Sequence, residues 1–287
     1  MRLKAHAKIN WALHITGVRA DGYHLLDMLV QRLELADDIE LIPQADLTLT
    51  LDGAHDAPAD RSNLAFRAAA ALKAATDYPN GAHIVLTKHI PSRAGLGGGS
   101  ADAAAVLRGL NTMWGTGLDT GQLAHIGMAL GADVPLCLHA GLARVGGIGE
   151  KIHPLSGAQA YQLVLLQPAA GLATREVFAR YDAALDNRTA DLPGAEHALR
   201  TGDPSRLKAV CHNQLQKSAA ALCPDIEKAV SSLYATGAAF SQMTGSGSAV
   251  FGVFSDWSSA QHAAKTLRQD WPVCLLRAGY GEWAAAA

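Results

Sequence analysis

The chain has 287 residues, and because single hydrophobic cores usually stop growing at about 250 to 300 residues, this length fits two lobes of one molecule. Apolar residues make up 49% and charged residues 17%, a globular composition that excludes the fibrous and disordered classes. With 24 Lys and Arg against 26 Asp and Glu the net charge is -2, so we expect no nucleic acid partner.

The cysteines and the hydropathy indicate an intracellular protein. Cys137, Cys211, Cys223 and Cys274 form no C-x-x-C pair, and a chain of this size needs no disulfide staples, so we predict four reduced thiols in a cytosol. No stretch approaches the roughly 20 apolar residues of a membrane span. We therefore expect a cytoplasmic protein that does not contact a membrane.

The first half of the chain begins with strands. Alternating apolar and polar residues predict a strand from Leu3 to Ile15, with Lys8 and Asn10 side by side on its polar face. A turn at Asp21-Gly22 follows, and an antiparallel sheet is the economical arrangement. Further strands are expected at residues 28–35, 39–43, 47–51 and 83–91. Apolar residues at helical spacing predict a helix from Asn63 to Ala75.

A second helix is expected to follow the glycines at 95–99 and to close near Trp114. Gln122 to Leu130 predicts a short helix, and residues 134–147 are expected to be mostly strand. The pattern restarts past Leu155, which predicts two domains, 1–154 and 155–287. In the second domain we expect strands at 161–168, 239–243, 249–254 and 272–279. Helices are expected at 174–185, 225–237 and 258–269, and residues 187–205 are expected to form a polar connection. Its strand-strand-helix-strand ending suggests a ferredoxin-like lobe, and its alanine-rich end is expected to fray.

The segment PSRAGLGGGSADAAAVL, residues 91–107, places four glycines within five positions at the mouth of a helix. Glycines adopt positive φ and carry no side chain, so consecutive N–H groups can converge on an anion at the positive end of the helix. Ser100 is predicted as the N-cap of this helix. The alternative is a plain glycine-rich turn, but turns seldom need so many glycines. Neither a Walker A loop nor a Rossmann fingerprint matches the spacing.

This segment resembles the central motif of the galactokinase, homoserine kinase, mevalonate kinase and phosphomevalonate kinase (GHMP) superfamily. Two further strings, KINWALHITGVRADGYHLLDML at 8–29 and LGADVPLCLHAGLARVGGIGE at 130–150, narrow the resemblance to the 4-diphosphocytidyl-2-C-methyl-D-erythritol kinases of the non-mevalonate isoprenoid pathway. The resemblance implies a two-lobed α+β GHMP kinase fold, with an N-terminal lobe like the second domain of ribosomal protein S5, a ferredoxin-like C-terminal lobe and a cleft between them.

The resemblance implies ATP-dependent phosphorylation of the 2-hydroxyl of the cytidyl diphosphate sugar alcohol. Asp133, between a helix end at Gly131 and the stiffening Pro135, could accept the hydroxyl proton, and Lys8 would keep that carboxylate charged and balance charge on the phosphoryl group. Taken alone, Lys8 would be an exposed strand residue and Asp133 a turn residue. Mg²⁺ is expected as well, with Ser100 as one contributor to a metal site that the sequence leaves undefined.

Two further groups of residues match family positions. Expected ATP contacts are Pro91, Gly95, Leu96, Gly97, Gly98, Gly99, Ser100, Ala101, Asn63 and Asn111, although both asparagines could equally be capping or turn residues. Expected substrate contacts are Asn10, Tyr23, His24, Thr174 and Phe178, with the aromatic rings stacking on cytosine. The segment TGSGS at 244–248 matches a third motif beneath the substrates, or else is a hairpin turn.

Two rival functions are weighed against this one. A different small-molecule kinase of the superfamily would keep the glycine loop but gives no reason for Lys8-Ile9-Asn10 together with Tyr23-His24. A ligand-binding or regulatory protein on the same fold would be expected to lose Lys8 or Asp133, and both are present.

Overall fold

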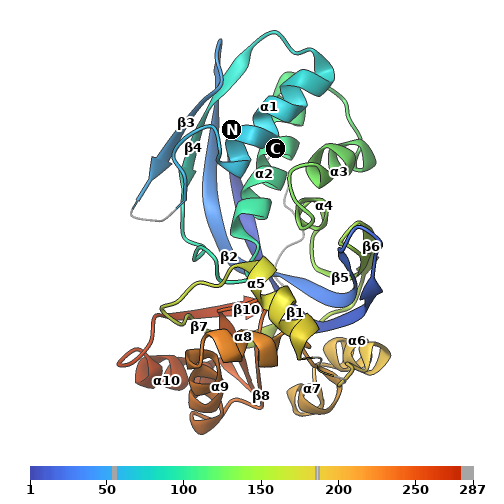
Figure 1. Cartoon of the computed structure of the whole chain (residues 1–287). Helices are drawn as coiled ribbons and strands as arrows, with labels where there is room; N and C mark the ends of the chain where they lie inside the picture. The colour runs from blue at the N-terminus through green and yellow to red at the C-terminus, as the bar shows by residue number, and fades with distance from the viewer. Residues whose placement is uncertain (54–56, 185, 187, 279–287) are drawn as a thin grey trace.

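The computed structural model describes residues 1–53, 57–184, 186 and 188–278. Within them, one half of the chain carries α1 to α4 and the other carries α5 to α10, and the long strands β1 (Arg2–Val18) and β2 (His24–Gln44) run between the two groups (Figure 1). The alanine-rich end that was expected to fray lies outside the described residues.

The sheet of the first half is built around β2. Besides β1 and β2 its strands are β3 (Thr48–Asp52), β4 (Gly81–Thr87), β5 (Leu142–Gly147) and β6 (Lys151–Leu155). The two strands expected at 28–35 and 39–43 are one continuous strand, β2, which pairs antiparallel with β1, β4 and β5. The expectation of a wholly antiparallel sheet is wrong at its edge, because β3 runs parallel to β4 and helix α1 connects the two strands.

The helices of this half cover the sheet and lead to the cleft. They are α1 (Leu64–Thr76), α2 (Gly98–Trp114), α3 (Thr120–Met128) and α4 (Val134–Cys137). Asn63 caps α1 by accepting a hydrogen bond from the Ala65 amide at 2.9 Å. The prediction of strand from residue 134 is wrong for α4, because Pro135 favours the first turn of a helix and lacks the N–H that a ladder needs.

The second half packs its helices against a four-stranded antiparallel layer. Its elements are β7 (Tyr161–Leu166), α5 (Thr174–Ala183), α6 (Leu192–Thr201), α7 (Pro204–Val210), α8 (Gln216–Leu222), α9 (Asp225–Ala235), β8 (Phe240–Met243), β9 (Val250–Phe254), α10 (Trp257–Leu267) and β10 (Val273–Ala278). The polar connection expected at 187–205 instead contains α6 and the start of α7, each opened by an aspartate N-cap and a proline in its first turn.

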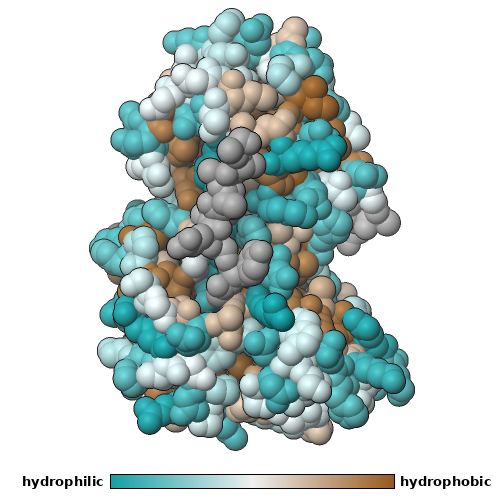
Figure 2. Space-filling view, turned by 180° about the vertical axis from the view of Figure 1, so that it is seen from behind, coloured by the Kyte–Doolittle hydropathy of each residue, from teal (hydrophilic) through white to brown (hydrophobic). Residues whose placement is uncertain are grey.

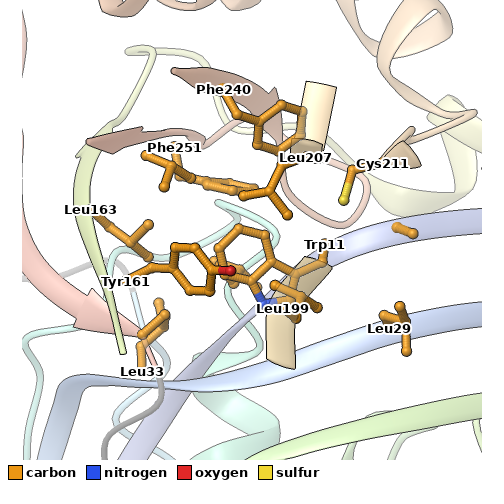
Figure 3. Packing of buried hydrophobic residues seen from close by; sticks show 14 of the residues in the cluster. Trp11, Leu29, Leu33, Tyr161, Leu163, Leu199, Leu207, Cys211, Phe240 and Phe251 are labelled. Carbon is orange, nitrogen blue, oxygen red and sulfur yellow. The ribbon is translucent and has the colours of Figure 1, made fainter. Parts of the chain in front are cut away.

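One sheet runs through both halves in the order β3-β4-β2-β10-β7-β9-β8, because β10 pairs with β7 and also meets β2. Beside this junction lies a buried cluster in which Trp11 of β1 contacts Tyr161 of β7 and Phe251 of β9, with ring centroids 5.2 and 5.4 Å apart (Figure 3). The Trp11 indole donates to Gln31 at 2.7 Å, so its one polar atom is satisfied within the core.

The domain boundary predicted at residue 155 falls on the last residue of β6. Seen from behind, the outline is notched between an upper and a lower body, and hydrophilic residues cover most of the face (Figure 2). Of the helices in the described part of the chain, none has the length and apolar character needed to cross a membrane.

Candidate active site

A cleft of about 1360 Å³ opens between the two halves. Of the seventeen site residues expected from the sequence, fifteen line this cleft. The residues that do so are Lys8, Asn10, Tyr23, His24, Asn63, Pro91, Gly95, Leu96, Gly97, Gly98, Gly99, Ser100, Asp133, Thr174 and Phe178. Ala101 and Asn111 were also expected there, but neither lines the cleft.

The glycine loop leads directly into helix α2. Gly95 and Gly97 have φ of 76° and 69°, and Gly97 is the residue before the first helical turn. The Gly97 carbonyl already accepts from the Ala101 amide at 2.9 Å, so the prediction of Ser100 as N-cap is wrong and Ser100 lies inside the first turn. The amides at the start of α2 are thus presented to the cleft by backbone alone.

A second glycine segment, 244–248, supports this loop from the other half. A Cβ on Gly95 would lie 2.3 Å from the Thr244 carbonyl oxygen, so only glycine fits there. The Ala249 amide donates to the Ala94 carbonyl at 3.1 Å, and Asn213 Nδ2 donates to the Gly245 carbonyl at 2.9 Å. The TGSGS segment therefore joins β8 to β9 and also fixes the glycine loop.

Lys8 and Asp133 come together at the floor of the cleft. The Lys8 Nζ lies 3.6 Å from Asp133 Oδ2 and donates to Asn10 Oδ1 at 2.9 Å. The ammonium group is buried, with its side chain 6% exposed, whereas the Asp133 side chain is 39% exposed and faces solvent at the N-cap of α4. An exposed carboxylate beside a buried cation is accessible to a bound alcohol.

Two features of the chain orient the Lys8 side chain. The β1–β2 register shifts between His6 and Lys8 and again between Asn10 and Ala12, and such bulges redirect side chains. The Lys8 backbone amide donates to the Leu96 carbonyl at 3.0 Å, and a Cβ on Gly97 would come within 3.1 Å of the Lys8 Cγ. The lysine stem consequently packs against the glycine loop itself.

A buried charge cluster beneath the loop was not expected from the sequence. Lys88 donates to Asp37 and, at 2.7 Å, to Asp102 Oδ2. Asp37 Oδ1 also accepts from the backbone amides of His89 and Ile90, at 2.5 and 2.8 Å, so it anchors the segment that enters the glycine loop. Lys88 and Asp102 line the cleft. Two features of the sequence could have indicated this cluster: the charged Lys88 close to Ile90, and the charged Asp102 within the alanine-rich α2.

The carboxylates compete for the single lysine of this cluster. Burial raises the pKa of Asp102 to about 8, with repulsion from Asp37 adding to the rise and Lys88 opposing it. Burial alone would lower the pKa of Lys88, but the charges of Asp102 and Asp37 outweigh it and the pKa is raised. Asp102 Oδ1 is buried and has no hydrogen-bond partner among the described residues, which fits a carboxyl group that keeps its proton.

The opposite wall of the cleft combines exposed side chains, such as Tyr23, with the partly buried rings of His24 and Phe178. The His24 ring stacks on Phe178 with centroids 4.6 Å apart, and its Nε2 hydrogen-bonds Asp182 Oδ1 at 2.7 Å. Thr174 Oγ1 lies 2.9 Å from Ser246 Oγ, which links α5 to the second glycine segment. Tyr23 is 61% exposed, so its ring is free to contact a ligand. Asp182, which sequence reasoning missed, orients the imidazole.

The two asparagines expected near adenine have different positions. Asn63 caps α1 and lines the cleft. Asn111 accepts hydrogen bonds from Thr116 Oγ1 at 2.5 Å and from the Leu118 amide at 3.0 Å, which organises the turn after α2. Asn63 is therefore a helix cap and Asn111 a turn residue, which are the alternative roles that the sequence left open.

Comparison with known proteins agrees with this arrangement. The GHMP kinase N-terminal domain matches residues 63–141, and the GHMP kinase C-terminal domain matches residues 195–273. The 4-diphosphocytidyl-2-C-methyl-D-erythritol kinase of Rhizobium etli (strain CIAT 652) is 41% identical over 278 residues, which cover 94% of this chain and 92% of the relative. The chain belongs to the 4-diphosphocytidyl-2-C-methyl-D-erythritol kinase family. The relative from Verminephrobacter eiseniae (strain EF01-2) is 43% identical, over 87% of this chain and 84% of its own.

Solved structures agree with the family. A crystal structure of a 4-(cytidine 5'-diphospho)-2C-methyl-D-erythritol kinase superposes with a TM-score of 0.85 at 33% identity, covering 98% of this chain and 100% of that one. The mevalonate kinase of L. major superposes with a TM-score of 0.71 at 16% identity, covering 97% and 95%, and shows the shared fold alone. Membership of the 4-diphosphocytidyl-2-C-methyl-D-erythritol kinase family confirms the predicted GHMP kinase fold and the prediction of an ATP-dependent small-molecule kinase.

Proposed function

We propose that this chain transfers the γ-phosphoryl group of ATP to the 2-hydroxyl of 4-diphosphocytidyl-2-C-methyl-D-erythritol, giving the 2-phosphate and ADP. The observation that carries the proposal is the Lys8–Asp133 pair, 3.6 Å apart, on the floor of a cleft that the glycine loop enters from one side and Tyr23 and His24 line on the other. Family membership supports the same reaction.

Asp133 acts as the proton acceptor in this proposal. The 2-hydroxyl loses its proton to the carboxylate as its oxygen bonds to the γ-phosphorus, and the bond between that phosphorus and the bridging oxygen of ADP breaks. Lys8 is fixed by Asn10 and by the glycine loop, so its positive charge is already in place when negative charge shifts between the oxygens. The proton leaves Asp133 to solvent, which reaches this half-exposed carboxylate.

The backbone amides of residues 95–100 hold the ATP phosphates, and the start of α2 adds its positive end. Mg²⁺ typically binds through one or two protein oxygens together with substrate phosphates. The Ser100 hydroxyl lines the cleft and bonds to no described residue, so it is the protein oxygen that would hold the ion together with the phosphates. When bound, Mg²⁺ would neutralise charge on the β- and γ-phosphates.

The cytidine end of the acceptor is bound by the wall that Tyr23, His24 and Phe178 form, with Asn10 and Thr174 closer to the sugar alcohol. A pyrimidine offers a π face for stacking and polar edge atoms for a histidine. We also retain residues 1–154 as the ATP-binding domain, residues 155–287 as the substrate-side domain, and the cytoplasm as the site of the reaction.

The test is ATP consumption by the purified protein with Mg²⁺ in the presence of 4-diphosphocytidyl-2-C-methyl-D-erythritol, mevalonate or homoserine. We expect turnover of the cytidyl compound alone. Turnover of mevalonate or homoserine instead would agree with phosphate binding by the glycine loop but would refute the role given to Tyr23 and His24.

A further inference from the structure

The cationic side chains that line the cleft divide into two groups. Lys8 faces the Asp133 carboxylate at 3.6 Å, and Lys88 faces the buried Asp37 carboxylate. Arg93 and Arg175 also line the cleft, yet neither forms a hydrogen bond or an ion pair within the described part of the chain. A guanidinium group presents five donors and binds phosphate in bidentate fashion, so these arginines are open to an anionic ligand.

Arg93 differs from Arg175 in its backbone. Its φ is 53°, and the one other non-glycine residue with positive φ in the described ranges is Asp77, at the end of α1. Bulky residues rarely adopt this region, because the Cβ crowds the following carbonyl oxygen. A residue held in a costly conformation beside a site is a reason to look for a function.

The position of Arg93 relates it to the phosphate loop. It lies two residues before Gly95, and its exposed side chain starts at the junction of the two halves, where a Cβ on Gly171 would be 2.9 Å from the Arg93 Cβ. Glycine at 171 thus leaves room for the arginine stem. Arg175, by contrast, follows Thr174 on α5, at the acceptor wall.

We propose that Arg93 binds a phosphate group of ATP and holds it against the glycine loop. The loop amides contribute partial charges, and Lys8 and Lys88 have their charges offset by carboxylates, so Arg93 supplies a full positive charge that nothing in the described structure neutralises. The residue with this strained backbone also lines the cleft, where a bound phosphate group can offset the cost of the strain. The inference rests on the proposed function for the identity of the nucleotide.

The experiment replaces Arg93 by glycine, which adopts positive φ without strain. We expect Arg93→Gly to raise the KM for ATP roughly tenfold, the order expected from losing hydrogen bonds to a charged group. The KM for the cytidyl acceptor should be unchanged. Calorimetric titration should show weaker ATP binding and unchanged adenosine binding, because adenosine carries no phosphate.

The same variant should be no less stable than the parent, and its melting temperature should rise by about 1–3 °C because the strain is relieved. A weaker ATP site in a protein of equal or higher stability cannot come from misfolding. The matched control is Asp77→Gly, which relieves the same kind of strain at an exposed residue remote from the cleft and should leave both KM values unchanged. Arg93→Lys retains the charge and should recover part of the ATP affinity.

Three outcomes separate the possibilities. An unchanged KM for ATP in Arg93→Gly would overturn the inference. A rise in the KM for the cytidyl acceptor instead would assign the arginine to the acceptor's diphosphate and would also overturn it. Absence of turnover by the parent protein with this acceptor would refute the proposed function, whereas ATP titration without acceptor would still decide whether Arg93 binds the nucleotide.

Discussion

The two walls of the cleft are built by different means. On the phosphate side, the loop backbone is anchored by side chains removed from solvent, with Asp37 fully buried and Lys88 and Asp102 nearly so. On the acceptor side, the contacts come from side chains that solvent reaches, including Tyr23 and an Asp182 carboxylate that is 53% exposed. The ordering of the His24 ring depends on one ring stack and one hydrogen bond to Asp182.

This difference follows from what each wall recognises. Phosphate oxygens are bound by amides whose directions must be fixed before the ligand arrives, so buried anchors that cannot reorient suit that side. A cytosine ring is bound by stacking, which side chains can complete as the ligand enters. We therefore expect substitutions on the phosphate side to alter stability as well as catalysis, and substitutions on the acceptor wall to alter affinity alone.

The largest expected effect is on kcat and comes from Asp133, on the floor of the cleft between the two walls. Asp133→Asn should lower kcat by about 10²- to 10⁴-fold, since the amide cannot accept the hydroxyl proton. The unfolding free energy should change little, because the Asp133 side chain is 39% exposed and bonds no backbone amide. Steady-state kinetics and urea unfolding measure the two quantities. An Asp133→Asn protein with parental kcat would exclude this residue as the base.

The next effect tests the buried anchor. Asp37→Ala should reduce the unfolding free energy by about 3 kcal/mol, because it removes one partner of Lys88 and leaves the buried amide of Ile90 and the part-buried amide of His89 unpaired. Urea unfolding measures the change.

The adjacent Asp38 provides a control for the loss of a carboxylate. Asp38 pairs with Lys4 on the surface, and Asp38→Ala should cost less than about 1 kcal/mol. Equal losses at positions 37 and 38 would contradict the contrast between a buried anchor and a surface pair.

A third test uses pH. The pKa of Asp102 is raised from 3.8 to about 8, chiefly by burial, so its protonated form favours the folded state. The stability it contributes is complete below its unfolded pKa and is lost as the pH rises toward about 8. Asp102→Asn mimics the protonated group, and its stability relative to the parent should increase steadily across this pH range. Thermal unfolding at several pH values measures it, and a constant difference would refute the shifted carboxyl.

The smallest effect concerns the acceptor wall. Asp182→Asn removes the charge that orients His24 but leaves the ring stack on Phe178. The KM for the cytidyl acceptor should rise a few-fold, while the KM for ATP and the melting temperature stay at parental values. A fall in stability as large as that of Asp37→Ala would mean that the two walls are not built differently after all.

Local patterns predicted the elements whose partners lie nearby in sequence. The alternation in β1 placed Lys8 and Asn10 on one face, and the glycine run placed the loop before α2. Asp37 could not be interpreted in this way. Its partner Lys88 is 51 residues away, and no local pattern links the two. The sequence pattern places Asp37 between two short strands, but in the structure it is buried within the single strand β2.

The sequence was least informative where a segment of polar composition forms regular secondary structure. Residues 187–205 look like a linker because few are apolar, yet α6 buries Leu192, Ala195, Ala198 and Leu199 on one face. The helix is defined by its aspartate and proline start signals more than by its composition. At the acceptor wall, the pairing of His24 with Asp182 depends on two elements 158 residues apart, which no local pattern encodes.

The position of β10 has a consequence for how the protein is made. This strand comes last in chain order among the described elements, yet it lies in the interior of the sheet, between β7 and β2. During synthesis, the strands before it leave the ribosome first and have a vacancy where β10 will pair. Until β10 has been synthesised, the edges of β7 and β2 that it covers are open and are available for pairing with other chains. The last of the described strands to be synthesised thus completes the sheet at the junction of the two halves.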